Sequence, residues 1–400
     1  MSERPRLLVL NQYYWPGVEA TAYLLTELCE SLAEEWDVTV VAGKTAGAEG
    51  GPTVRNGVRV VHVPSAAFER RRMGLRALNY ASYLALAAVS GVREVRPDVV
   101  LAMTDPPFVG AVAYAVARRF EAPFVLVSQD VFPETAAAVG RLRNRAVLAL
   151  IDALVGVALR NADRVVAIGE TMRERLVVKG VRRDAIRVIP NWVDVDAIGP
   201  EPRDNQWARS RGLADGFVVM HFGNLGYAQD LDTLVRASTL LGDLDGLRVA
   251  IIGRGAREAE LRTLARVLHA DRVVFVGHQP RRLASQCLSS GDVHVVGLAR
   301  GLAGYVVPSR LYGVLAASRP VIAAADAESE TARLVREVGC GIVVPPGDAE
   351  ALADAVRALR DGADEAGAMG RRGREYVVRE ASRKVAVARY RELLDKVRRR

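Results

Sequence analysis

The chain alternates between short, strongly apolar segments and longer segments in which apolar residues recur every three to four positions. The short segments are rich in valine and isoleucine and predict β-strands, whereas the longer ones are typical of amphipathic helices. Strands that are apolar on both sides indicate a parallel sheet covered by helices on both faces. In the first half of the chain the predicted strands are Leu7–Asn11, Val38–Ala42, Val58–Val63, Val99–Met103, Phe124–Ser128, Arg164–Ile168 and Ile186–Ile189.

The alternation breaks once and then resumes. Pro190, Pro200 and Pro202, followed by polar sequence up to Asp215, are typical of an interdomain linker. The second series of predicted strands is Phe217–Phe222, Leu247–Ile252, Val273–Val276, Val293–Val296, Pro320–Ala324 and Gly341–Val344. We therefore predict an α/β fold of two Rossmann-like, doubly wound domains that face a central cleft. The predicted parts are residues 1–195, residues 196–380, and a C-terminal helix in 381–400 that packs back on the N-terminal domain.

The cysteines and the apolar segments indicate the cellular compartment of the protein. The three cysteines lie far apart without a CxxC motif, which argues against structural zinc or a disulfide framework and fits a reducing cytosol. The sequence begins without a secretory pattern, and its apolar runs are shorter than the roughly 18 residues that span a bilayer. We therefore expect a cytoplasmic protein.

The net charge of +8 fits nucleic acid, an anionic membrane surface or anionic substrates. The basic residues are spread along the chain and form no nucleic-acid module, so we expect no nucleic-acid partner. The sequence holds no lysine between residues 180 and 383. A side-chain cation that binds a phosphate in this region must therefore be an arginine.

Two loops of the first half carry candidate functional residues. Gly17 lies in the loop after the first strand, where backbone N–H groups can face an anion, although GxGxxG is absent. Asp130 and Glu134 follow the fifth strand, at the end where catalytic groups commonly lie. The alternative interpretation of the Gly17 loop is an ordinary glycine turn. For Asp130 and Glu134, the alternative is a helix N-cap and an acidic residue in the first helical turn.

Three successive strands of the second half end in turns that contain glycine. Small residues let a backbone approach a ligand closely. We interpret Arg254 as a ligand for a base or a phosphate, or alternatively as a solvated turn residue. The candidate ligand-binding residues of these turns are Asn224, Gln229, Arg254, Gly277 and His278.

A later segment combines a helix start with polar groups. Pro308 suits the first helical turn, which places Ser309 and Arg310 at the positive end of the helix. Free N–H groups, a hydroxyl and a guanidinium there suit a diphosphate. A capped core helix is the plain alternative.

Seven segments of the chain resemble, in their order, the retaining glycosyltransferases of family 4, which have the GT-B fold. The resemblance is strongest to the branch of this family that builds bacterial surface polysaccharides and lipid-linked glycans. The segments are YYWPGVEAT, DVFPE, NADRVVAIGETMRERL, VIPNWVD, FGNLGYAQDLDTL, VPSRLYGVLAASRPVI and CGIVVPPGD. The resemblance implies a nucleotide-sugar donor, usually UDP-linked, and retention at the anomeric carbon. It also implies a glycan or polyprenyl-linked acceptor, a hexosyl or N-acetylhexosaminyl group, no cofactor and no obligatory metal.

The chain departs from the family pattern at a pair of glutamates. Their positions hold Tyr305 and Gly313. In the family, the second glutamate usually binds the ribose of the donor. That contact is therefore vacant here or is supplied by Glu328 or Glu330.

The family's phosphate-binding arginine and lysine are also missing, because Asn224 and Gln229 occupy that stretch. We expect Arg310, with Arg254, to carry that charge instead. The acceptor-side histidine of many relatives is absent as well, and Asp130 is the candidate substitute.

Two other functions remain open at this stage. A sugar-nucleotide epimerase of the same fold would need acid–base groups around the sugar ring. A non-catalytic nucleotide-sugar-binding protein would fit the missing glutamates.

The sequence also suggests peripheral attachment to the inner face of the plasma membrane. Arg70, Arg71 and Arg72 precede an apolar helix, a combination that suits an anionic lipid surface. The alternative is that the aromatic and apolar residues of this helix, including Tyr80, Tyr83 and Leu84, simply pack on the N-terminal sheet.

Overall fold

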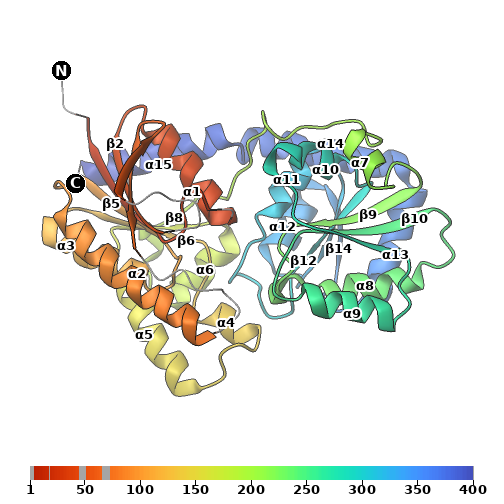
Figure 1. The fold of residues 1–400 in the computed structure, drawn as a ribbon, viewed down its shortest axis with the longest axis horizontal. Coiled ribbons are helices and arrows are strands. Elements are labelled where there is room, and N and C mark those ends of the chain that lie inside the picture. The colour runs from red at the N-terminus through yellow and green to blue at the C-terminus, as the bar shows by residue number, and fades with distance from the viewer. Residues whose placement is uncertain (1–3, 18, 45–50, 65–72, 400) are drawn as a thin grey trace. The chain divides into compact units, whose positions relative to one another are not determined.

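The computed structural model describes residues 4–17, 19–44, 51–64 and 73–399. The chain divides into two compact units (Figure 1). Unit 1 comprises Met1–Pro190 together with Arg383–Arg400, and unit 2 comprises Asn191–Ser382. Each unit has its own sheet, so each is described by itself.

Unit 1 is built on an eight-stranded sheet of order β3-β4-β2-β1-β5-β6-β7-β8. The central strands are buried along their whole length, as the apolar runs predicted. The strands are β1 (Arg6–Leu10), β2 (Asp37–Gly43), β3 (Gly51–Arg55), β4 (Val58–Val63), β5 (Val99–Met103), β6 (Phe124–Ser128), β7 (Arg164–Ala167) and β8 (Ile186–Val188).

One strand of this sheet was missed in the sequence. β3 pairs antiparallel with β4 and forms the edge, so the sheet is not wholly parallel. Asn56 and Gly57 turn the chain between them, both with positive φ (45° and 81°). Asn-Gly is a strong signal for a two-residue hairpin, and it was available in the sequence.

Helices cover both faces of the unit 1 sheet. Right-handed crossovers place α1 on one face and α2, α3, α5 and α6 on the other. The last helix, α15, packs on α1 within this unit. The helices are α1 (Ala20–Leu32), α2 (Met73–Arg93), α3 (Val109–Phe120), α4 (Glu134–Ala138), α5 (Arg145–Asn161), α6 (Glu170–Val178), the 3-10 turn η1 (Arg183–Ala185) and α15 (Arg383–Arg398).

Helix α2 contains the apolar residues of the segment that was predicted to bind a membrane. Tyr83 is fully buried, and its hydroxyl donates a 3.0 Å hydrogen bond to the Val41 carbonyl of β2. Tyr80 and Leu84 are half-buried. Tyr83 therefore packs on the sheet, while the arginines at 70–72 lie outside the described residues.

Unit 2 is built on a six-stranded sheet of order β11-β10-β9-β12-β13-β14, in which every pairing is parallel. All six strands were predicted. They are β9 (Phe217–Phe222), β10 (Leu247–Ile252), β11 (Val273–Val276), β12 (Val293–Gly297), β13 (Val321–Ala324) and β14 (Gly341–Val344). The chain runs outward from β9 in one direction and from β12 in the other, so the strand order reverses between these two neighbours.

The core of unit 2 lies between this sheet and its helices, with an aliphatic cluster that joins β9 and β10 to α8 and α13. The helices are α7 (Gln206–Ser210), η2 (Tyr227–Gln229), α8 (Leu231–Leu240), α9 (Glu258–Val267), η3 (Arg281–Leu283), α10 (Ala284–Ser289), α11 (Arg310–Ala316), α12 (Glu330–Val338), α13 (Ala349–Asp361) and α14 (Ala363–Glu380).

The stretch predicted as a linker is folded onto unit 2. Arg203 makes two 3.0 Å hydrogen bonds from its Nε to the Asp292 carboxylate, and Asn205 caps α7. Trp207 is buried and donates a 2.9 Å hydrogen bond to the side chain of Gln279. The prolines and polar residues made the sequence look like a linker, whereas these buried side chains anchor it.

Candidate functional site

The carboxyl ends of the unit 2 strands form one edge, where the loops are packed against one another. The Gly223 N–H donates to the Ile252 carbonyl, and the Leu225 N–H donates to the Arg254 carbonyl, both at 2.9 Å. A Cβ added to Gly253, whose φ is 141°, would lie 1.8 Å from the Gly223 oxygen. Gly253 therefore lets two backbone loops meet, and no other residue fits there.

Arg310 lies at the centre of this edge. Its guanidinium donates to the Gly297 carbonyl at the end of β12, and its Cδ would be 3.5 Å from a Cβ on Gly223 at the end of β9. Arg310 thus occupies the point where the strand order reverses, which is the usual ligand position in an open α/β sheet.

The Arg310 side chain keeps its charge without a partner carboxylate. Within the described part of the chain, its Nε is buried and has no hydrogen-bond partner, and no acidic group pairs with it. Desolvation lowers the pKa of Arg310 to about 10, so it remains a cation at neutral pH. A half-buried cation that lacks a partner carboxylate favours the binding of an anion.

His221, which sequence reasoning overlooked, lies next to this cation. The imidazole is fully buried, and desolvation, followed by the charge of Arg310, lowers the pKa of His221 to about 3. The ring is therefore neutral, and Arg310 supplies the charge. The signal was present in the sequence, since His221 is a polar residue within an apolar strand.

Ser309, the residue before Arg310, does not cap helix α11 with its side chain. Helix α11 is only seven residues long, so the guanidinium rather than a helix dipole is the main electrostatic feature. Ser309 and Arg310 both lie at this edge, and their contact with a diphosphate stays a prediction.

The remaining predicted donor residues follow neighbouring strands along the same edge. Asn224, Arg254 and His278 are exposed after β9, β10 and β11. Gly277 is open as well, with nothing within 4 Å of an added Cβ. Gln229 differs, because its Oε1 accepts a 2.9 Å hydrogen bond from the Gly226 N–H and so holds the loop itself.

Glu330 lies after β13, in the first turn of α12, and is 4% exposed. Its carboxylate pairs with Arg333 one turn later. Ser329 caps the helix through a 3.2 Å hydrogen bond from the Ala332 N–H. Glu328, the other candidate, is exposed.

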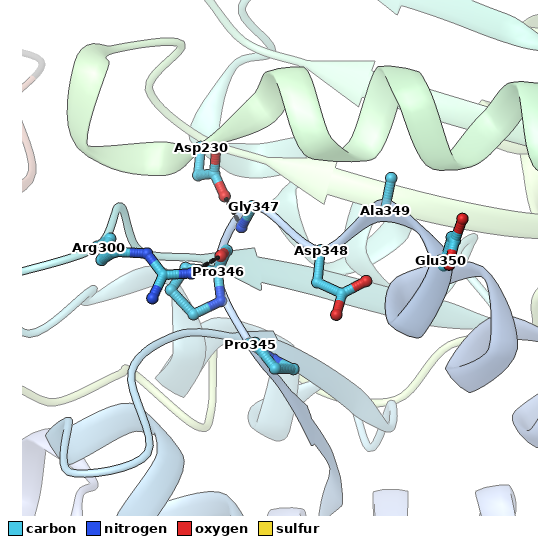
Figure 2. A pocket seen from close by; sticks show the side chains of 8 residues that line it. All are labelled: Asp230, Arg300, Pro345, Pro346, Gly347, Asp348, Ala349 and Glu350. Atoms are coloured by element: carbon cyan, nitrogen blue, oxygen red, sulfur yellow. Dashed lines mark hydrogen bonds between the residues drawn. The ribbon is translucent and has the colours of Figure 1, made fainter.

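A cavity of about 570 Å³ also lies in unit 2 (Figure 2). Asp230 accepts a 2.8 Å hydrogen bond from the Gly347 N–H, and Arg300 donates to the Pro346 carbonyl at 3.0 Å. Asp348 and Glu350 add two further carboxyl groups to its lining. This excess of acidic groups repels phosphate, so Arg310 marks the better anion site.

In unit 1, the carboxyl ends of β5 and β6 bring two acidic residues together. The Thr104 hydroxyl accepts hydrogen bonds from the N–H groups of Gln129 (3.0 Å) and Asp130 (3.3 Å). Desolvation, followed by the charge of Asp105, raises the pKa of Asp130 to about 7, although the residue is exposed. Asp105 was missed in the sequence, although it follows an apolar strand just as Asp130 does.

Glu134 has a different setting. It starts α4, and its Oε1 accepts a 2.6 Å hydrogen bond from Lys179, whose side chain is 8% exposed. Lys179 also pairs with Asp152 of α5. Glu134 therefore helps to hold three elements together, and Lys179 is a residue that sequence reasoning missed.

The loop after β1 brings buried polar groups to the same edge. Asn11 and Gln12 are buried, and the Gln12 N–H donates a 2.9 Å hydrogen bond to the Asp105 carbonyl. Gly17 lies further along this loop, where an added Cβ would meet the Tyr14 carbonyl at 2.8 Å. Gly17 thus permits a tight loop.

Within the described residues, no three histidine, cysteine, aspartate or glutamate side chains gather as metal ligands would. No helix in those residues is both long and apolar enough to cross a membrane.

Comparison with known proteins agrees with this architecture. Residues 19–192 match the model of the "Glycosyl transferase 4-like domain", and residues 216–361 match that of "Glycosyl transferases group 1". The chain is 27% identical over 360 residues to the "Probable glycosyltransferase WbjE" of Pseudomonas aeruginosa, covering 87% of this chain and 88% of that protein. It is also 27% identical over 304 residues to the "Putative colanic acid biosynthesis glycosyl transferase WcaI" of Escherichia coli K12, covering 72% of each.

Among solved structures, HepE of Anabaena in complex with UDP-glucose superimposes with a TM-score of 0.76 at 16% identity, covering 98% of this chain and 99% of that chain. The fold and the two matched domains together identify the family of this chain. The chain belongs to the GT-B glycosyltransferases, with a glycosyl transferase 4-like domain followed by a glycosyl transferases group 1 domain.

Proposed function

We propose that this protein transfers a hexosyl or N-acetylhexosaminyl group from a UDP-sugar to a glycan or lipid-linked acceptor, with retention at the anomeric carbon. The observation that carries the proposal is Arg310, an unpaired cation at the switch point of the unit 2 sheet. Support for UDP comes from HepE, which was solved with UDP-glucose. Support for polysaccharide synthesis comes from the Escherichia coli relative, a putative colanic acid biosynthesis glycosyl transferase.

The chemistry follows from the charge that develops in the reaction. As the bond between the sugar and the diphosphate breaks, negative charge grows on the leaving diphosphate. Arg310, half-buried and held in place by the Gly297 carbonyl, stabilises that charge. Ser309 offers a hydroxyl to the same oxygens. We propose that this arrangement replaces a metal, so that turnover needs no divalent cation and no cofactor.

Unit 1 would supply the acceptor side. Retention by attack on the same face requires no enzyme nucleophile. Asp130, with a pKa near 7, can hold a proton or a hydrogen bond at the acceptor hydroxyl around neutral pH. Glu134, tied to Lys179, serves better as a support for this edge than as a proton carrier.

Donor binding and turnover can be tested separately. A series of nucleotide sugars is screened by thermal shift, because a ligand that binds only the folded state raises the melting temperature. We expect UDP and a UDP-sugar to raise it and other nucleoside diphosphates to raise it less. Incubation of the donor without an acceptor distinguishes transfer from epimerisation, since an epimerase converts the donor alone. Release of UDP only when an acceptor is added supports the proposal.

We also propose that the protein acts at the inner face of the plasma membrane as a peripheral protein. The net charge of +8 and the lipid-linked acceptor are its support. The arginine cluster that first suggested this lies outside the described residues.

A further inference from the structure

Helix α5 of unit 1 carries an apolar stripe that stays exposed among the residues that the structure describes. Val147, Leu150, Leu154 and Val157 are 40%, 62%, 46% and 41% exposed. Their spacing of three, four and three residues places them on one side of the helix. The stripe extends for about 15 Å at 1.5 Å per residue. Exposed aliphatic residues are common singly, but a continuous line of them indicates a binding surface.

The other face of α5 is fixed to the body of unit 1. Val155, Ala158 and Leu159 are buried, and the helix packs on α3, where an added Cβ on Gly110 would lie 3.0 Å from the Ala158 Cβ. The side chain of Asn144 caps the start of the helix by accepting from two N–H groups. The stripe is therefore presented by a rigid helix whose orientation in unit 1 is set by its buried face.

Basic residues accompany the stripe. Arg143 and Arg145 are exposed where α5 begins, and Arg160 is exposed at its end. Within the helix the single acidic residue is Asp152, which Lys179 neutralises. An apolar line flanked by arginines, without an unpaired carboxylate, complements a surface that is apolar inside and anionic outside.

We propose that α5 lies in the headgroup region of an anionic phospholipid bilayer, with the stripe Val147, Leu150, Leu154 and Val157 toward the acyl chains. The arginines contact the lipid phosphates. This inference rests on the proposed function in one respect, the lipid-linked acceptor, and it assigns the membrane contact to α5 rather than to the segment around residues 70–72. A helix of this kind lies in the interface plane and does not cross it.

The full-length protein is tested by co-sedimentation with vesicles of phosphatidylcholine alone or mixed with phosphatidylglycerol. We expect binding to the mixed vesicles that weakens at high salt. The variant Leu150→Gln/Leu154→Gln should bind roughly tenfold less, because two half-exposed leucines no longer enter the apolar region. Arg143→Ser/Arg145→Ser should bind about 25-fold less, since each basic residue near an anionic surface contributes about fivefold.

The matched control is Leu240→Gln/Val267→Gln, which changes two exposed aliphatic residues of unit 2 and should bind as the wild type does. Equal binding by the wild type and the α5 variants overturns the inference, as does a wild type that binds no vesicles. A wild-type dimer that the leucine variant converts to a monomer also overturns it, because a second copy then covers the stripe.

The UDP-induced rise in melting temperature is measured for every variant. A retained rise in a variant that has lost vesicle binding supports the inference and shows that its fold is intact. Absence of the rise in the wild type would instead count against the proposed function, while the vesicle result would still decide the role of α5.

Discussion

The carboxyl-end edges of the two sheets differ in charge. In unit 2, the strand order reverses at a cation, Arg310, which is accompanied by a neutral histidine. In unit 1, the corresponding edge carries two carboxyl groups, Asp105 and Asp130, and the charge of Asp105 adds to the desolvation that raises the pKa of Asp130. We propose that the first edge binds an anionic diphosphate and that the second faces an acceptor hydroxyl that gives up a proton.

The two edges also differ in how they are held. Unit 2 relies on backbone packing between glycine-containing loops, whereas unit 1 relies on side chains, namely Thr104 for the β6 loop and Lys179 for α4. One added methyl group should therefore disrupt the first edge, while loss of one charge should loosen the second. The predictions that follow separate these cases.

The largest effect is expected for Gly253→Ala. The new Cβ would lie 1.8 Å from the Gly223 oxygen, at a φ that side chains rarely adopt. We expect a loss of about 3 kcal/mol or more in the free energy of unfolding of unit 2, together with loss of UDP binding.

Chemical denaturation and UDP titration measure these two effects. Gly277→Ala is the matched control, because nothing lies within 4 Å of its Cβ, and it should leave the stability nearly unchanged. Comparable stability of the two alanine variants would refute the idea that packed loops hold this edge.

The next effect is expected for Arg310→Ala. Loss of a charged hydrogen bond to the diphosphate should weaken UDP binding by about 1.5–3 kcal/mol, which is roughly 10- to 150-fold. Arg310→Lys keeps the charge but loses the planar fork, and it should fall between the alanine variant and the wild type. Calorimetric titration with UDP gives the affinities. If the alanine variant binds UDP as tightly as the wild type, the anion site lies elsewhere.

A smaller effect, on stability, is expected for Lys179→Met. Removing this ammonium leaves Glu134 and Asp152 unpaired, and one oxygen of Glu134 already lacks a partner within the described residues. Because both carboxylates keep some contact with solvent, we expect about 1–3 kcal/mol of destabilisation rather than the full cost of a buried pair.

Lys396→Met is the control for this change, since its pair with Glu392 is exposed and should contribute little. Urea denaturation measures both variants. An unaltered Lys179→Met protein would mean that Glu134 is not anchored by this lysine and is free for another role.

The sequence predicts the strand framework well, because strands buried on both faces leave continuous apolar runs. It also predicts Arg310, since this region lacks lysine and the residue follows a proline at a helix start. β3 was missed because a short edge strand is only partly apolar, and its Asn-Gly turn was the better signal.

The unit 1 edge could not be predicted to the same depth. The pairing of Asp105 with Asp130 depends on β5 and β6 being neighbours, and the link from Lys179 to Glu134 joins residues 45 positions apart. Such contacts are set by topology and leave no local pattern. In unit 2 the opposite error occurred, because composition alone made residues 191–215 look like a linker although Trp207 and Arg203 fix them in place.

The smallest effect, and the one that tests the charge difference most directly, is expected for Asp105→Asn. The charge of Asp105 contributes to the raised pKa of Asp130, so its removal should lower that pKa from about 7 toward the ordinary range of a carboxyl group. If the Asp130 carboxylate is the active form, kcat/KM of the wild type should rise with pH through about 7, and the variant should show the same limb at lower pH. Asp105→Glu retains the charge and should keep the wild-type limb.

Stability should respond in a related way. The folded state holds the Asp130 proton to higher pH than the unfolded state does, so the contribution of this group to stability falls as pH rises from about 4 to about 7. In Asp105→Asn this decline should be smaller, because the pKa difference between the two states is reduced. Identical pH profiles of kcat/KM and of stability in the wild type and the variant would show that the two carboxyl groups do not interact, and the unit 1 edge would then lose the feature that distinguishes it.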